Sequence, residues 1–195
     1  MEVELREGLV QVYTGKGKGK TTAALGLGLR ASGHGLKVKM IQFLKGGNYT
    51  GELKAIKNLT NFKIDQFGKK CSYSEKIQRG EIECTGCGDC FVTANNRDEH
   101  KKFVKEAYQY SKKVLTEAKS DIVILDEINN ALEFNFLTNE EVLKLIEHKS
   151  AKTELVLTGR GLPAEILAAA DLVTEMKKIK HPFTEGISSR RGIEY

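Results

Sequence analysis

The sequence of 195 residues lacks any apolar run long enough to cross a membrane. No stretch reaches the roughly 18 consecutive apolar residues of a transmembrane helix. The N-terminal MEVELREG carries acids where a signal peptide needs a basic start followed by an apolar segment. We therefore expect a cytoplasmic protein with no membrane partner.

A strong charge imbalance is also missing. The chain has 31 Lys and Arg against 26 Asp and Glu, a net charge of +5. This excess suits a polyanionic ligand but is too small to indicate nucleic acid. The basic residues are spread along the chain and do not alternate with aromatic residues, as they would on a base-stacking surface. A bound nucleotide accounts for the charge, and we expect no nucleic-acid partner.

What the chain does contain, in residues 10–22, is VQVYTGKGKGKTT. This pattern predicts a strand, a glycine- and lysine-rich loop and the start of a helix. Gly19, Lys20 and Thr21 end a P-loop, in which backbone N–H groups and the lysine bind phosphate and the threonine hydroxyl can hold Mg2+. In the usual G-x-x-x-x-G-K-[ST] pattern a glycine would stand where this chain has Thr14. The segment predicts binding of a nucleoside triphosphate.

Apolar strands alternate with amphipathic helices in the rest of the chain. Further strands are predicted over 37–44, 62–67, 121–125, 154–158 and 172–176, and helices over 20–32, 52–58, 95–119, 139–148 and 163–170. The helix 95–119 is expected to bury Phe103, Ala107, Tyr110, Val114, Leu115 and Ala118. The alternation predicts an α/β, three-layer P-loop (RecA-like) fold with a mostly parallel central sheet, and the length suits one nucleotide-binding domain over 1–195.

The apolar strand 121–125 ends in Asp126 and Glu127. Because the carboxyl ends of parallel strands meet at the edge where ligands bind, these acids can reach a metal held by the phosphate loop. We predict an Mg2+ site made of Thr21, Asp126 and Glu127. The alternative is an acidic turn after a core strand.

Residues 68–93 show no periodicity and contain all four cysteines. We interpret this segment as a cysteine-rich insertion, here called the cysteine flap. Cys84, Cys87 and Cys90 have C-x-x-C spacing, and Cys71 is a possible fourth ligand. In a reducing compartment such cysteines favour zinc or an iron–sulfur cluster. Free thiols or an incidental disulfide are the alternatives.

Five segments together resemble one known family. They are VYTGKGKGKTTAALGLGLRA, QFLKG, DIVILDEI, LTGRG and the terminal KHPFTEGISSRRGIEY. In this order they resemble the ATP:corrinoid adenosyltransferase family, over nearly the whole chain apart from the cysteine flap. The threonine at the first loop position, the KHPF segment and the closing G-I-E-aromatic are the most specific matches.

The resemblance implies transfer of the 5'-deoxyadenosyl group of ATP to the cobalt(I) of a corrinoid, with release of triphosphate. The nucleophile is then reduced cobalt, so the protein needs no general base and no nucleophilic side chain, and the sequence offers no such constellation. Its tasks are to position the substrates and to stabilise charge on the leaving group. The reversed orientation of ATP described for this family would account for Thr14.

The resemblance also implies site residues. Lys20, Thr21 and Glu127 would be catalytic, with Thr21 and Glu127 at the Mg2+ positions and Asp126 either supporting these ligands or serving as an alternative ligand. The nucleotide or corrinoid would contact Thr14, Gly15, Lys16, Gly17, Lys18, Gly19, Lys20, Thr21, Thr22, Arg160, Arg190 and Phe91, with Lys180, His181 and Arg191 as further candidates in the tail. Each arginine could instead form a structural ion pair. Phe91 stands where the family has a corrinoid-facing aromatic pair, although this chain has no tryptophan. A homodimer and an electron donor such as a flavoprotein are also implied.

Two other functions compete with this interpretation. The first is a P-loop kinase or ATPase, similar to thymidine kinase with a zinc lobe, in which Glu127 would activate water or a substrate hydroxyl. Such an enzyme would release ADP, whereas the transferase releases triphosphate. The second is a nucleotide-gated nucleic-acid binder whose cysteine flap is a zinc knuckle.

Overall fold

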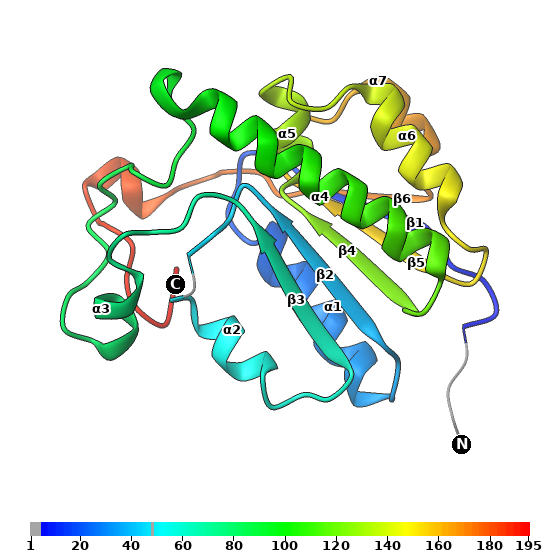
Figure 1. Ribbon diagram of the computed structural model, residues 1–195, viewed down its shortest axis with the longest axis horizontal. Coiled ribbons are helices and arrows are strands. Elements are labelled where there is room, and N and C mark those ends of the chain that lie inside the picture. Colours follow the sequence, from blue (N-terminus) through cyan, green and yellow to red (C-terminus); the bar gives the residue numbers. More distant parts are fainter. Residues whose placement is uncertain (1–4, 48) are drawn as a thin grey trace.

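A computed structural model describes residues 5–47 and 49–195 of the chain. In this part a sheet of six parallel strands lies between two layers of helices (Figure 1). The strands are β1 Val10–Thr14, β2 Val38–Phe43, β3 Phe62–Phe67, β4 Ile122–Asp126, β5 Glu154–Thr158 and β6 Leu172–Glu175. Their order in the sheet is β3-β2-β4-β5-β1-β6. The α/β, three-layer P-loop fold predicted from the sequence is confirmed.

The helices are distributed over both faces of this sheet. They are α1 Lys20–Gly33, α2 Gly51–Ile56, α3 Ser74–Arg79, α4 Arg97–Glu117, α5 Ile128–Glu133, α6 Asn139–His148 and α7 Ala164–Ala169, with short 3-10 helices η1 Ala94–Asn96 and η2 Pro182–Glu185. In Figure 1, α4 and α6 pass in front of the sheet and α1 lies behind it. Residues 1–4 and Asn48 lie outside the described part.

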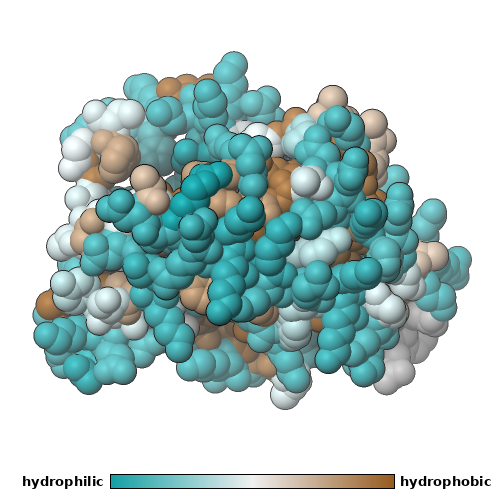
Figure 2. All heavy atoms as spheres, turned by 45° about the horizontal axis from the view of Figure 1, so that its top comes forward, coloured by the Kyte–Doolittle hydropathy of each residue, from teal (hydrophilic) through white to brown (hydrophobic). Residues whose placement is uncertain are grey.

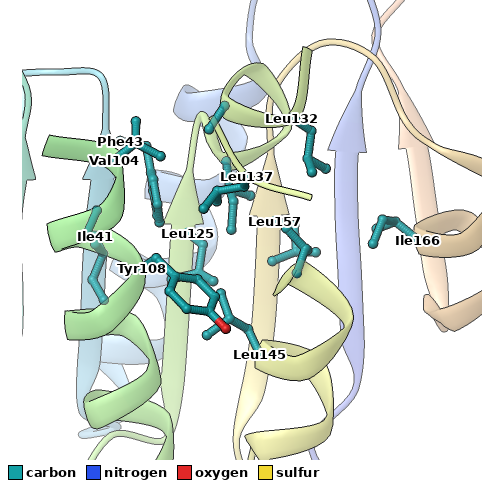
Figure 3. Close-up of a cluster of buried hydrophobic side chains, with 14 of the residues drawn as sticks. Ile41, Phe43, Val104, Tyr108, Leu125, Leu132, Leu137, Leu145, Leu157 and Ile166 are labelled. Atoms are coloured by element: carbon teal, nitrogen blue, oxygen red, sulfur yellow. The ribbon is translucent and has the colours of Figure 1, made fainter. Parts of the chain in front are cut away.

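The core follows from strands that are apolar on both faces. Every residue of β4 is buried, as a strand covered by helices on both sides requires. One face of the sheet packs against α4, α5, α6 and α7, and Figure 3 shows this cluster through Ile41, Phe43, Val104, Tyr108, Leu125, Leu132, Leu137, Leu145, Leu157 and Ile166. On the other face Met40, Ile124 and Val156 pack against Ala24 and Ala31 of α1.

The strand order brings the predicted site segments to one edge of the sheet. β5 lies between β1 and β4 and pairs with both, Thr158 opposite Tyr13 and Leu157 opposite Leu125. Because all strands are parallel, the loop after β1 and the acids that end β4 emerge at the same carboxyl edge. Sequence-distant groups therefore meet there.

The buried face of α4 differs from the prediction. The buried residues are His100, Val104, Ala107, Tyr108, Ser111 and Leu115. Ala107 and Leu115 were predicted correctly, but Ala118 is exposed and the other three predicted residues are only half-buried. The buried stripe includes the polar Ser111, whose hydroxyl donates to the Ala107 carbonyl at 2.7 Å. A prediction based on apolar residues alone therefore places the buried face of α4 on the wrong side of the helix by part of a turn.

Two helices were not predicted from the sequence. α5 follows Glu127 directly and buries Ile128, Ala131 and Leu132 in the core. α3 lies inside the cysteine flap, to the left of the sheet in Figure 1, and buries Ile77. Both have only six residues, too few to display a helical period, and tertiary contacts stabilise them.

The surface in Figure 2 is hydrophilic over most of the face shown, with smaller hydrophobic areas between the polar side chains. Among the helices of the described residues, none is both long and apolar enough to cross a membrane.

The start of α6 yields a stability prediction. The Thr138 hydroxyl accepts from the Glu141 backbone N–H at 3.2 Å, and the Glu141 carboxylate accepts from the Thr138 N–H at 2.9 Å, so the two residues form a capping box. Thr138→Ala should lower the free energy of unfolding by about 1 kcal/mol in urea titrations. Thr116→Ala, on the exposed face of α4, is the control. An unchanged midpoint for Thr138→Ala would contradict the role of the cap.

Candidate functional site

The phosphate loop joins β1 to α1 and is fixed by the chain that follows β6. Gly15 has φ +100°, and a Cβ there would lie 2.5 Å from the Met176 carbonyl oxygen, so only glycine fits. The Gly17 N–H donates to that oxygen at 2.6 Å, and the Met176 N–H donates to the Thr14 carbonyl at 2.8 Å. The loop conformation therefore depends on β6 as well as on its own glycines.

Lys20 closes this loop from the first turn of α1. Its buried ammonium donates to the carbonyls of Gly15 and Gly17, both at 2.8 Å. Burial lowers the pKa of Lys20, an effect that the nearby Glu127 carboxylate opposes. The lysine charge thus lies inside the curve of the loop, where a phosphate-binding P-loop lysine is needed.

Asp126, at the end of β4, is fully buried and accepts four hydrogen bonds. Its Oδ1 accepts from the hydroxyls of Thr21 at 2.8 Å and Thr158 at 2.7 Å. Its Oδ2 accepts from Lys45 Nζ at 2.7 Å and Gln42 Nε2 at 3.0 Å. Burial alone would raise the pKa of Asp126, but the charge and hydrogen bonds of these donors outweigh it, and the pKa lies below its usual value. Asp126 is therefore an anion at neutral pH.

Glu127 follows in a left-handed conformation with φ 64°. Its backbone N–H donates to the Thr158 hydroxyl at 3.0 Å, and its Oε1 lies 3.9 Å from Lys45 Nζ. Burial raises the pKa of Glu127, although the Lys45 charge opposes the rise. Within the described residues its Oε2 is buried without a hydrogen-bond partner. The three side chains predicted to hold Mg2+, those of Thr21, Asp126 and Glu127, are thus brought together.

Gln42, Lys45 and Thr158 also reach this centre, although the sequence analysis gave them no role. Gln42 is a fully buried polar residue near the carboxyl end of β2, and Thr158 is the buried last residue of β5. Polar side chains at the carboxyl ends of buried strands are the signal that could have identified both. Lys45 follows β2 in a turn whose direction only the structure shows.

A cavity of about 1180 Å³ opens beside the phosphate loop. Its walls are residues 14–18 of that loop, residues 160–162 after β5 and much of the tail between Lys177 and Glu194. Seven basic residues line it (Lys16, Lys18, Arg160, Lys177, Lys178, Lys180 and Arg190) against three acids (Glu133, Glu175 and Glu194). The predicted contacts Arg160 and Arg190, and the tail candidates Lys180 and His181, therefore share one cavity with the phosphate loop.

Other predicted residues lie away from this cavity. Phe91 stands in the cysteine flap with 62% of its surface exposed and does not line the cavity. Thr22 is exposed on α1. Arg191 donates to the Gln78 carbonyl at 3.5 Å, on the side of the flap.

The tail connects the phosphate loop to the cysteine flap. The Glu194 carboxylate accepts from Lys18 Nζ at 2.8 Å and from the Arg190 guanidinium at 3.1 Å, and these hydrogen bonds hold the pKa of Glu194 well below its usual value. The neighbouring Tyr195 hydroxyl accepts from the Cys84 N–H at 3.1 Å, and its ring contacts that of Tyr49 edge-on at 5.6 Å. Arg190 thus forms an ion pair and lines the cavity at once.

The four cysteines are free thiols of differing exposure. Cys71 is buried, Cys84 and Cys90 are half-buried, and Cys87 is exposed. Burial raises the pKa of the Cys90 thiol, and the charges of the other three cysteines add to the rise. No group of three or more His, Cys, Asp or Glu side chains in the described ranges is arranged to hold a metal ion. The zinc or iron–sulfur centre stays a prediction.

Comparison with known proteins gives one consistent family. Residues 6–195 match the sequence model of the ATP:corrinoid adenosyltransferases BtuR/CobO/CobP. The chain is 35% identical to a corrinoid adenosyltransferase of Sinorhizobium sp over 190 residues, which cover 97% of this chain and 81% of that protein. It is 34% identical to that of Escherichia coli K12 (96% and 86% covered) and 30% identical to corrinoid adenosyltransferase CobA of Salmonella typhimurium LT2 (100% and 89% covered).

The buried carboxylate yields a second stability prediction. Asp126→Asn replaces an anion with an amide whose NH2 group faces hydrogen-bond donors, and should lower the free energy of unfolding at pH 7 by about 3 kcal/mol. Asp89→Asn, in the exposed flap, should change it by less than about 0.5 kcal/mol. Urea titrations measure both.

The pH dependence of the same variant has a defined sign. A carboxylate whose pKa is lowered by folding contributes stability that is present above its unfolded pKa of about 3.9 and is lost as the pH falls through the folded pKa. The difference between wild type and Asp126→Asn should therefore shrink below about pH 4. A constant difference between pH 7 and pH 3 would contradict the assignment.

Proposed function

The chain belongs to the ATP:corrinoid adenosyltransferase family, and we propose that the phosphate loop and the basic cavity beside it carry out the family's reaction. In this reaction the 5'-deoxyadenosyl group of ATP moves to the cobalt(I) of a corrinoid. The observation that carries the assignment of the site is the cavity itself, in which the loop, Arg160 and Arg190 converge with an excess of basic residues.

The electron balance of the transfer explains what the site must provide. Cobalt(I) donates its electron pair to C5', a cobalt–carbon bond forms, and the C5'–O bond breaks. The triphosphate leaves with that bond pair, and cobalt becomes formally cobalt(III). No proton is transferred, so the protein contributes position and charge stabilisation. Lys20 and the basic residues of the cavity can supply the charge stabilisation for the leaving triphosphate.

The ion pairs of the tail support this placement of the triphosphate. Lys18 and Arg190, which both line the cavity, are paired with the single carboxylate of Glu194. A triphosphate carries more negative charge than one carboxylate and offers more acceptor oxygens. It can therefore replace Glu194 as the partner of Lys18 and Arg190.

We include Mg2+ in the proposal, held by Thr21, Asp126 and Glu127. A hydroxyl and two carboxylates are the oxygen ligands that Mg2+ prefers. The unpartnered buried Oε2 of Glu127 supports this, because an isolated buried carboxylate oxygen is costly without a cation or donor. When bound, Mg2+ would neutralise charge on the triphosphate. Thr158 would hold the Asp126 carboxylate in place through its hydrogen bond of 2.7 Å.

For the corrinoid we propose a contact with Phe91. Its high exposure supports this, together with the hydrogen bond of 2.9 Å from Asn96 Nδ2 to the Phe91 carbonyl, which fixes the flap just before α4. Because the reaction consumes cobalt(I), the proposal includes an electron donor such as a flavoprotein. It also includes a homodimer, which the family resemblance implies.

The cysteine flap carries a separate proposal, a zinc or iron–sulfur centre on Cys71, Cys84, Cys87 and Cys90. The C-x-x-C spacing supports it. The described side chains are not arranged as a metal-binding group, so such a centre would require the cysteines to move closer together than they lie here. The transfer step draws nothing from it.

The function is tested by incubating the protein with ATP, Mg2+ and chemically reduced cobalamin. We expect the absorbance spectrum of the adenosylated product and one triphosphate released per transfer. Lys20→Ala should lower the rate at least about 100-fold, because it removes the loop's buried cation. Lys57→Met, at an exposed lysine, should keep the wild-type rate. Release of ADP without adenosylation would favour the kinase interpretation.

The metal proposal is tested by elemental analysis of anaerobically purified protein. We expect zinc or iron in the wild type and its loss in Cys84→Ser. A wild type that contains neither element would contradict a metal centre in the flap.

A further inference from the structure

The ammonium of Lys45 lies among the oxygen atoms that would hold Mg2+. Its Nζ is 2.7 Å from Asp126 Oδ2, 3.2 Å from Thr21 Oγ1 and 3.9 Å from Glu127 Oε1. The ammonium forms ion pairs with both Asp126 and Glu127. These contacts place the Lys45 ammonium where the proposed Mg2+ would bind.

The backbone before Lys45 is shaped to direct the side chain there. Leu44 has φ 61°, a left-handed conformation that is costly for leucine and that surrounding structure must impose. Gly68, after β3, packs so closely on this turn that a Cβ would lie 2.5 Å from Leu44 C and from Lys45 N. The turn is thus fixed by the residue that follows the neighbouring strand, and the Lys45 side chain contacts Asp126 at the end of β4 and Thr21 at the start of α1.

Two cations cannot share these oxygens at contact distance. Mg2+ binds its oxygen ligands at about 2.1 Å, so a metal on Thr21 and Asp126 would repel an ammonium that remains bonded to the same two groups. On metal binding Lys45 must find another anion. The polyphosphate that binds with the metal is the nearest available acceptor. In nucleotide sites Mg2+ is coordinated by phosphate oxygens as well as by protein oxygens, so the phosphates lie next to the metal.

Building on the proposed function, we propose that Lys45 is an exchangeable counter-ion of the site and a further catalytic residue. Without nucleotide its ammonium holds Thr21, Asp126 and Glu127 together. With nucleotide bound it moves to the triphosphate, where it stabilises the charge that the leaving group gains.

The first test measures binding of Mn2+, as a probe of the divalent site, to nucleotide-free protein by electron paramagnetic resonance. Lys45→Met removes a competing cation and should tighten Mn2+ binding about tenfold. Lys45→Arg keeps a cation and should stay within about threefold of wild type. Lys57→Met, an exposed lysine at the end of α2, should leave the affinity unchanged. A purely structural role predicts the opposite sign, since a disrupted site would bind Mn2+ more weakly.

The second test measures adenosyl transfer at saturating Mg2+ and ATP. Lys45→Met should lower kcat about 100-fold, and Lys45→Arg should recover part of the loss. If Lys45→Met is poorly folded, the increase in melting temperature on adding Mn2+ serves instead, and it should be larger for Lys45→Met than for wild type.

The two proposals fail in different ways. A wild type that does not adenosylate reduced cobalamin would contradict the proposed function, while the Mn2+ measurements would still decide whether Lys45 occupies the metal position. A wild type that transfers, with Mn2+ affinity and kcat unaltered in Lys45→Met, would overturn the role of Lys45 alone.

Discussion

The buried carboxylate of Asp126 is the interaction on which the rest of the site depends. A buried anion is tolerated only when charges and hydrogen bonds compensate it, and here the donors come from the start of α1, from β2, from the turn after β2 and from the end of β5. Meeting this one requirement fixes the phosphate loop, through Thr21, against three strands of the sheet. The fold and the site are therefore stabilised by the same bonds.

Four basic groups of the site are held by internal acceptors. Lys20 donates to carbonyls of its own loop, Lys45 to Asp126, and Lys18 and Arg190 to Glu194. A site that must stabilise a leaving triphosphate needs concentrated positive charge, which would be self-repulsive without such partners. The internal acceptors keep these cations in place. A ligand with more negative charge can replace these acceptors as the partner of the cations. This arrangement suits a reaction in which the protein supplies electrostatics and no proton transfer.

The tail and the cysteine flap belong to this network although they are far apart in sequence. Glu194 contacts the phosphate loop while the adjacent Tyr195 contacts Cys84 and Tyr49. Two neighbouring residues of the tail therefore connect the flap to Lys18. This gives a physical reason for the closing G-I-E-aromatic segment, which connects two regions that the sheet does not connect.

The sequence by itself determined the features that depend on local pattern. The strand–loop–helix of the phosphate loop, the apolar strands ending in Asp126 and Thr158, and the capping box at Thr138 each depend on residues within one segment, so residue type and spacing were sufficient. Only the tertiary structure decided which side chains meet. Gln42 and Lys45 reach Asp126 because β2 lies beside β4, and residues 14–18 share a cavity with Arg160 because β5 lies beside β1. The short α5 and the buried face of α4 were likewise set by packing, because a six-residue helix and a stripe containing Ser111 gain their stability from neighbours that no local period encodes.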